Sequence, residues 1–230
     1  MQIIAEIDGN YSNTMKENIH DLIKYSKLVF WDFDGVIKDS VEVKSLAFEK
    51  LFAIYGPEIS KQVRKHHEQN TGLSRFDKIP LYMTWSGELV SDKSVQEFCT
   101  KFSYLVKKAI INSPWVPGVR EFLIENCRKK FFVLVTATPQ KEMVEILSFV
   151  NIKECFREVH GAPSKKEDII RSFLNKQKIM RNKALMIGDS ETDFLAAKSN
   201  MIPFVLCRSG VNCTFQESYK GISFSSLIKG

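Results

Sequence analysis

Four apolar runs along the chain are each followed at once by small or polar residues. The runs cover residues 28–31, 131–135, 184–187 and 203–207, and they lead into Asp32, Thr136, Gly188 and Arg208. Nearly continuous apolar stretches of about four to eight residues are typical of strands that are buried on both faces of a parallel sheet. The pattern therefore predicts four parallel strands whose carboxyl ends carry polar residues.

Helical periodicity fills the intervals between these strands. Apolar residues recur at helical spacing over 119–127, 143–150 and about 166–176. Thr138 as a cap and Pro139 at a first-turn position predict the start of the second of these helices. Because strands and helices alternate, we expect an α/β fold, a three-layer Rossmann-like parallel sheet with helices on both faces.

Residues 41–113 break this alternation, because they contain helical patterns only. One apolar face ends at Gly56-Pro57, and a second extends from Val95 to Ala109. We expect an all-helical cap domain at 41–113, inserted after the first core strand and placed above the strand ends. The α/β core domain would comprise 28–40 and 114–230, with a second hinge at 114–118. Residues 1–27 would form an N-terminal extension with a short helix, packed on the core.

Composition and charge narrow the class of protein. The 230 residues are 44% hydrophobic and 26% charged, which is ordinary for a globular protein. No apolar run approaches the roughly 20 residues of a membrane span, and no signal peptide is recognisable, so we expect a cytoplasmic protein without a membrane partner. The five cysteines lack metal-ligand spacing and suit reduced thiols.

The net charge of +6 raises the question of nucleic acid. Basic residues are dispersed among acidic ones, and no basic stripe interleaved with aromatic residues occurs, so no nucleic-acid partner is expected. A mild positive field would instead favour a small phosphorylated metabolite. A monomer or a homodimer is compatible with the sequence.

Two carboxylates stand at the end of the first predicted strand. Asp32 and Asp34 are one residue apart, and Gly35 lets the chain turn so that both can converge. Neighbouring carboxylates repel each other unless a shared proton or a divalent cation offsets the charge. Asp189 and Asp193 follow the third run, and ligands of open α/β sheets bind at such strand ends. The pattern predicts chemistry on an anionic substrate with a metal.

The ordered set of Asp32 and Asp34, Thr136, a lysine at 165 or 166, and the acids of residues 188–193 resembles the four-part signature of the haloacid dehalogenase superfamily. The resemblance implies that Asp32 is the nucleophile that forms an aspartyl-phosphate and that Asp34 is the general acid and base. Thr136 would bind a phosphoryl oxygen. In relatives with a Gly-small-Pro-x-x-Lys arrangement the lysine falls three residues after the proline, so the resemblance favours Lys166 over Lys165 as the lysine that offsets the phosphate charge, and both stay open.

The same resemblance implies Mg²⁺, held by Asp32, the Asp34 backbone carbonyl, Asp189 and, less directly, Asp193. A second likeness lies in the predicted cap, where residues 71–77 resemble the Gly-x-Ser-Arg loop of β-phosphoglucomutase and related phosphatases. It makes Arg75 the candidate specificity residue, since a guanidinium can bind an anion with two hydrogen bonds. Lys44 and Lys78 are further candidates on that face, and Ser40, Ala137 and Lys165 complete the substrate-binding set.

These implications lead to an Mg²⁺-dependent phosphatase, a phosphomonoester hydrolase acting on a small phosphorylated metabolite. A sugar phosphomutase like β-phosphoglucomutase is the alternative, but Lys44 stands where that mutase has a histidine, and Gly188 where it has a glutamate. A non-catalytic protein that binds a phosphorylated ligand on the same scaffold is a third possibility. The four histidines are expected to have no catalytic role.

Overall fold

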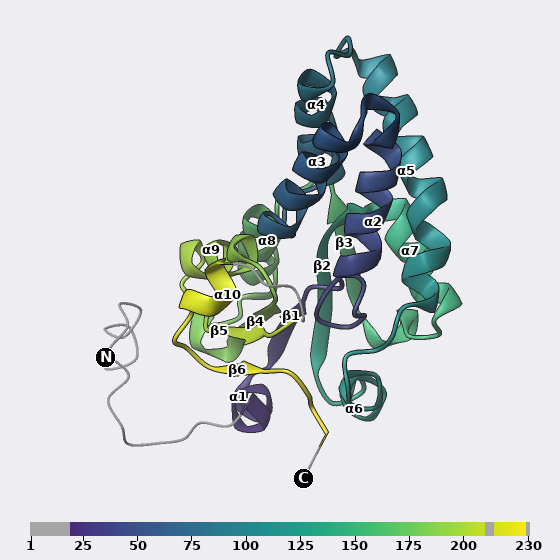
Figure 1. Ribbon diagram of the computed structural model, residues 1–230. Helices are drawn as coiled ribbons and strands as arrows, with labels where there is room; N and C mark the ends of the chain where they lie inside the picture. Colours follow the sequence, from purple (N-terminus) through teal and green to yellow (C-terminus); the bar gives the residue numbers. More distant parts are fainter. Residues whose placement is uncertain (1–18, 210–213, 229–230) are drawn as a thin grey trace.

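The computed structural model describes residues 19–209 and 214–228. Within these ranges one parallel sheet has the strand order β3-β2-β1-β4-β5-β6 (Figure 1). The strands are β1 (Leu28–Trp31), β2 (Phe131–Pro139), β3 (Glu158–Ala162), β4 (Ala184–Gly188), β5 (Phe204–Cys207) and β6 (Ser223–Phe224). All four strands that the sequence predicts are present, and β3 and β6 are additional.

Alternate residues of the central strands enter two separate apolar cores, which makes the fold three-layered. Val29 and Trp31 of β1 belong to a core shared with α6 (Val119–Asn126) and α7 (Gln140–Phe149). Leu28 and Phe30 belong to the other core, shared with α8 (Lys166–Gln177) and α9 (Glu191–Ser199). The expected α/β class with helices on both faces is confirmed.

A group of helices rises above one end of the sheet (Figure 1). It consists of α2 (Val41–Phe52), the 3-10 turn η1 (Ala53–Tyr55), α3 (Pro57–Gln69), α4 (Arg75–Trp85) and α5 (Asp92–Asn112). Stacked and edge-on aromatic rings fill its interior, with Phe48 against Phe102 and Phe52 against Phe98. We call α2 to α5 the cap, and its boundaries at 41 and 113 stay a prediction.

The chain enters and leaves the cap through two adjacent segments. The Asp39 amide donates to the Pro114 carbonyl at 2.9 Å, and the Val116 amide donates to the Ile37 carbonyl at 3.0 Å. Between them Lys38 and Trp115 form an antiparallel bridge, and the Lys38 ammonium lies 4.5 Å from the centre of the Trp115 ring. The two crossings are therefore joined to each other by hydrogen bonds.

The short N-terminal helix that the sequence predicts is α1 (Ile19–Tyr25). Ile19 and Ile23 are buried in the same core as Val29 and Trp31, so this part of the extension packs on the sheet domain. Residues 1–18 of the expected extension lie outside the described residues. The remaining short elements are η2 (Lys153–Cys155), η3 (Arg181–Lys183) and α10 (Thr214–Ser218).

The predicted start of the helix after β2 is wrong. β2 continues to Pro139 because its pairing with β3 shifts register after Val135 and resumes where Pro139 faces Ala162. α7 therefore begins at Gln140, and Thr138 is a buried strand residue that does not cap the helix. This extension places Thr138 near the carboxyl end of β2.

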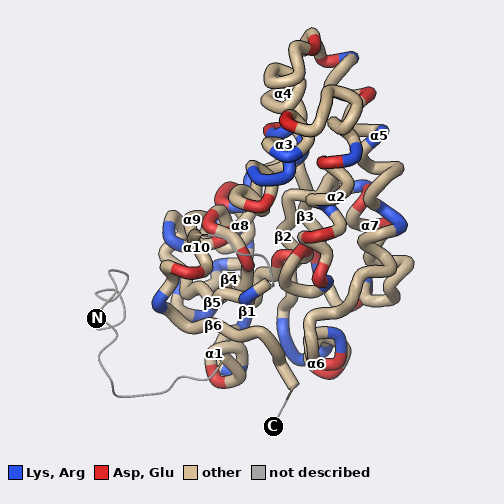
Figure 2. The backbone as a smooth tube through the Cα atoms, in the orientation of Figure 1, with Lys and Arg blue, Asp and Glu red and all other residues tan. Residues whose placement is uncertain are grey.

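Lys and Arg are interspersed with Asp and Glu along both the core and the cap (Figure 2). Arg64 of α3 illustrates the mixing, because it contacts Glu42, Glu49 and Glu68. None of the helices in the two described ranges combines the length and the apolar character that a membrane crossing requires.

Candidate active site

The carboxyl ends of three strands and the first turns of two helices bring the predicted catalytic residues together. β1 leads into the loop that carries the first two acids, β2 carries the threonine, and β4 leads into the third acid, while α8 and α9 supply a lysine and the fourth acid. A pocket between this strand edge and the cap is lined by both. The residues brought together are Asp32, Asp34, Thr136, Lys166, Asp189 and Asp193.

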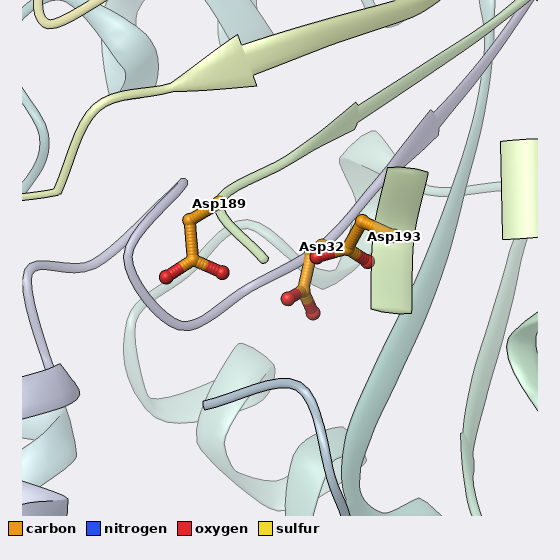
Figure 3. A group of neighbouring side chains, drawn as sticks. All are labelled: Asp32, Asp189 and Asp193. Atoms are coloured by element: carbon orange, nitrogen blue, oxygen red, sulfur yellow. The ribbon is translucent and has the colours of Figure 1, made fainter. Parts of the chain in front are cut away.

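Three of the acids form a compact buried cluster. Asp32, Asp189 and Asp193 are each at most 4% exposed. They offer carboxylate oxygens that lie within 4.8 Å of one another. Figure 3 shows Asp32 between the other two, with Asp193 reaching toward it from α9. Buried carboxylates so close together require positive charge for compensation.

That compensation is incomplete within the protein. Among the described residues, Asp32 Oδ1 and Asp189 Oδ2 have no hydrogen-bond partner although both atoms are buried. Burial, with the charges of Asp193 and Asp34 adding to it and Lys166 opposing it, raises the pKa of Asp32 to about 7. Burial and the neighbouring charge of Asp32 raise the pKa of Asp189 well above its ordinary value. Two orphaned carboxylate oxygens in a buried acidic cluster suit a hard divalent cation.

Lys166 provides the positive charge that the protein itself brings to this cluster. Its ammonium lies 2.9 Å from Asp32 Oδ2 and 2.6 Å from Asp193 Oδ1. Burial alone would lower the pKa of Lys166, but Asp193 and Asp32 outweigh burial and raise it. The neighbouring Lys165 is exposed at the position before α8, so of the two candidate lysines the structure brings Lys166 to Asp32.

Asp193 has both carboxylate oxygens engaged. Oδ1 receives the Lys166 contact, while Oδ2 accepts from the Ser190 hydroxyl at 2.6 Å in a capping box at the start of α9. These contacts orient Lys166 toward Asp32. The role of Asp193 as a metal ligand stays a prediction, because a cation would have to share these oxygens.

Asp34 is enclosed by a different set of donors. Its Oδ1 accepts from the Ser40 hydroxyl at 2.6 Å, and its Oδ2 accepts from Lys44 at 2.5 Å and from Thr138 at 3.2 Å. Burial alone would raise the pKa of Asp34, but the Lys44 ion pair and these hydrogen bonds lower it. Ser40, predicted to bind substrate, thus contacts Asp34, the predicted general acid and base, in this structure.

Thr136 and Ala137 lie in the pocket wall beside Asp32. The Thr136 side chain is buried, and its hydroxyl oxygen accepts from the Thr138 amide at 3.2 Å. A hydroxyl at the end of β2 can still donate its proton to a phosphoryl oxygen, because accepting from an amide uses only its lone pairs.

Two glycines allow the acidic side chains of the cluster to pack closely against the backbone. Gly35 has φ 74°, a left-handed conformation that a side chain disfavours, and a Cβ there would lie 2.4 Å from Asp189 Oδ2. A Cβ on Gly188 would lie 2.3 Å from the Asp193 Cβ. The positions of Asp189 and Asp193 therefore depend on the absence of side chains at residues 35 and 188.

Arg75, the predicted specificity residue, is 4% exposed and lines the pocket. Its Nη1 and Nη2 donate to Glu142 of α7 at 2.9 and 2.7 Å, and Ser103 of α5 contacts both partners. The guanidinium carbon also lies 4.6 Å from the centre of the Phe102 ring. In this structure Arg75 joins the cap to the core, and a substrate would have to compete with Glu142 for its terminal nitrogens.

Replacing Glu142 by Gln is expected to lower the free energy of unfolding by about 3 kcal/mol, because it leaves the buried Arg75 charge without its partner. Glu145→Gln is the matched control on the same helix. Glu145 also pairs with a cap residue, Lys107, but that pair is largely exposed and should contribute little. Urea unfolding of both variants would measure the difference, and equal losses would contradict the assignment of a buried cap-to-core contact.

Several contacts of the site were not predicted from the sequence. The Glu142 carboxylate contacts Arg75 and the Thr138 hydroxyl contacts Asp34, and both pairs are distant in the chain and marked by no motif. His67, one of the four histidines expected to have no catalytic role, is 2% exposed and lies 2.8 Å from the Lys78 ammonium. The sequence could not show that His67 of α3 and Lys78 of α4 are buried against each other, because this depends on how the two helices pack.

The sequence of this chain is similar to those of known phosphatases and matches one protein family. The family model described as haloacid dehalogenase-like hydrolase matches residues 29–207. A phosphoglycolate phosphatase of Vibrio cholerae is 28% identical over 185 residues, which cover 77% of this chain and 82% of the relative. A phosphoglycolate phosphatase of Vibrio parahaemolyticus is 29% identical over 181 residues, covering 75% and 79%.

Solved structures share the fold at lower identity. A protein described as a predicted phosphoglycolate phosphatase from Haemophilus somnus has a TM-score of 0.68 at 19% identity, covering 87% of this chain and 95% of that one. A variant of CbbY from Rhodobacter sphaeroides, in complex with xylulose-(1,5)bisphosphate, has a TM-score of 0.70 at 16% identity, covering 87% and 94%. The predicted fold and the predicted enzyme class, a haloacid dehalogenase-like phosphatase, are confirmed. The chain belongs to the haloacid dehalogenase-like hydrolases.

Proposed function

We propose that the protein is an Mg²⁺-dependent phosphomonoester hydrolase that acts on a small phosphorylated metabolite through an aspartyl-phosphate intermediate. The observation that carries the proposal is the state of Asp32. It lines the pocket, its Oδ2 is held by Lys166, and its Oδ1 has no partner among the described residues. A carboxylate held by one oxygen and unengaged at the other is suited to nucleophilic attack.

In the first step a carboxylate oxygen of Asp32 forms a bond to phosphorus while the bond between phosphorus and the ester oxygen breaks. Asp34 protonates the departing oxygen, and it then takes a proton from the water that hydrolyses the aspartyl-phosphate. The ion pair with Lys44 favours the deprotonated form of Asp34. The protonating step therefore requires the Lys44 contact to loosen when substrate enters.

Thr136 and Lys166 would bind the phosphoryl oxygens whose negative charge develops during transfer. Asp32, Asp189 and the Asp34 backbone carbonyl would hold Mg²⁺, with Asp193 beside them. A bound divalent cation supplies charge neutralisation of the phosphoryl group and lowers the repulsion between the two anions that must meet. The orphaned oxygen of Asp189 and the convergence of the Asp32, Asp189 and Asp193 carboxylates support this assignment.

Two features of the site favour hydrolysis over the phosphomutase reaction. Lys44, which stands where the mutase has a histidine, is bound to the acid/base Asp34. Gly188, which stands where the mutase has a glutamate, has no room for a side chain beside Asp193. The names of the curated relatives support a phosphatase, and phosphoglycolate is the first substrate to test. The buried thiols Cys99, Cys155 and Cys207 are free, which is consistent with a cytoplasmic enzyme.

Removing the metal is expected to lower phosphate release at least about 100-fold, because the acidic cluster then repels the phosphate dianion. Inorganic phosphate would be measured from a panel of small monoesters in Mg²⁺, in EDTA, and in EDTA followed by excess Mg²⁺. Recovery in the third condition would exclude unfolding as the cause. Full turnover in EDTA would contradict the metal assignment. Isomerisation of a hexose phosphate without phosphate release would favour the mutase, and inactivity in both assays would favour a ligand-binding protein.

A further inference from the structure

Three lysine or arginine side chains line the pocket, and a fourth, Lys166, contacts Asp32. Three of the four have carboxylate partners. Lys44 pairs with Asp34, Arg75 with Glu142, and Lys166 with Asp32 and Asp193. The remaining one is Lys78 of α4, for which no ion pair is formed within the described residues.

Lys78 is 1% exposed, so water does not substitute for a counter-ion. Its ammonium lies 2.8 Å from His67 Nδ1 and 5.8 Å from the centre of the Phe48 ring. Neither neighbour carries a negative charge. One is the face of an aromatic ring, and the other is an imidazole nitrogen. An ammonium group that is buried without an anion is costly, and the cost is removed when an anion binds next to it.

Burial lowers the pKa values of both His67 and Lys78. Burial, with the charge of Lys78 next, holds the pKa of His67 well below its ordinary value, so the imidazole is neutral and its Nδ1 accepts a hydrogen bond from Lys78. Burial, with the charge of Lys44 next, holds the pKa of Lys78 well below its ordinary value. The lowered pKa means that the ammonium form of Lys78 is destabilised where it stands, and an anion bound beside it would stabilise that form again.

Lys78 enters the pocket from the cap, whereas the groups assigned to the phosphoryl transfer belong to the core. Asp32, Thr136 and Asp189 line the same pocket from the ends of the strands. The cap loop before α4 closes directly over that edge, since a Cβ on Gly72 would lie 1.7 Å from Thr192 Oγ1 and 2.4 Å from Ser190 Oγ. A ligand whose phosphoryl group is bound at Asp32 would thus present its other end to Lys78.

We propose that Lys78 binds a carboxylate at the end of the substrate remote from the phosphoryl group, so that the enzyme selects short phosphate esters of hydroxy acids. The proposal rests on the phosphatase function inferred above. One unpaired positive charge matches one negative charge, which a carboxylate carries. A second phosphate group would bring nearly twice that charge, and Arg75 and Lys44 are already paired. Lys78 thereby takes the specificity role that the sequence suggested for Arg75.

The test compares two esters that differ in the remote group, phosphoglycolate and ethyl phosphate. The wild-type kcat/KM is expected to be at least about 10-fold higher for phosphoglycolate, since ethyl phosphate lacks the carboxylate that would form a hydrogen-bonded charge pair with Lys78. Lys78→Met should lower kcat/KM for phosphoglycolate by about 10- to 100-fold and leave that for ethyl phosphate within about three-fold. Lys78→Arg, which keeps the charge, should recover part of the preference.

Lys61→Met on the exposed face of α3 is the matched control, and it should leave both values unchanged. Equal losses for both esters in Lys78→Met would overturn the proposal, because they would assign Lys78 a structural role. If that variant does not fold, the wild-type ratio decides, and a ratio near one overturns the proposal. Failure of the underlying function is distinct, because the wild type would then release phosphate from neither ester nor from p-nitrophenyl phosphate in Mg²⁺.

Discussion

Asp32→Asn is expected to reduce phosphate release by about 10⁴-fold or more, the largest effect of any single substitution in this chain. The amide has nearly the shape of the carboxylate but lacks the negative charge and the nucleophilic oxygen that form the aspartyl-phosphate. Lys166 can still donate to the amide oxygen, as it does to Asp32 Oδ2 at 2.9 Å. The measurement is inorganic phosphate release in Mg²⁺ from the best monoester found for the wild type.

The fold of this variant should be retained, because no volume is lost and one negative charge is removed from a crowded acidic cluster. Circular dichroism and a thermal unfolding curve would establish that the loss is chemical. A folded Asp32→Asn enzyme that kept more than about one per cent of the wild-type rate would exclude Asp32 as the nucleophile.

Lys166→Met is expected to lower phosphate release by about 10³-fold, because the developing phosphoryl charge loses its nearest protein cation. Unlike Asp32→Asn, it should also destabilise the protein. The substitution leaves Asp32 and Asp193 buried without the ammonium that now lies within 2.9 Å of both, and breaking such a contact costs about 3–5 kcal/mol. Phosphate release and urea unfolding would be measured on the same preparation.

Lys165→Met is the matched control, one residue earlier in the chain and exposed. It should leave stability and turnover close to wild type. Added Mg²⁺ should restore part of the stability of Lys166→Met, since a divalent cation can neutralise the same carboxylates, without restoring the rate. If Lys165→Met were the more damaging substitution, the assignment of Lys166 would be wrong.

The strands most accessible to prediction were those whose whole length is apolar. β1 coincides with the predicted run 28–31, because both of its faces are covered and every side chain is buried. β3 escaped prediction because Glu158, His160 and Gly161 interrupt any apolar pattern. It is the edge strand beside β2 and has a neighbour on one side only, so its composition is less constrained.

The acids of the core were predictable because each follows a strand that is itself evident in the sequence. The cap contacts were not, since they depend on how α3, α4 and α7 meet in space. Arg75 was identified as a residue that faces the pocket, but its partner Glu142 lies 67 residues away on an element of the core. Only the assembled structure shows that this guanidinium is already bound by a carboxylate and that, within the described part of the chain, Lys78 is the basic residue of the pocket without one.

The hydrogen-bonded pair of crossings between Ile37 and Val116 has a consequence for how such an enzyme can diversify. Hydrogen bonds hold the two ends of the inserted segment together. The entropy cost of closing such a segment grows only with the logarithm of its length, so it depends weakly on what lies between the ends. Segments of other lengths and sequences can occupy the interval without altering the distance that the core must span. Recombination at these crossings would exchange the cap as one unit, while Asp32 and the acidic cluster are inherited unchanged.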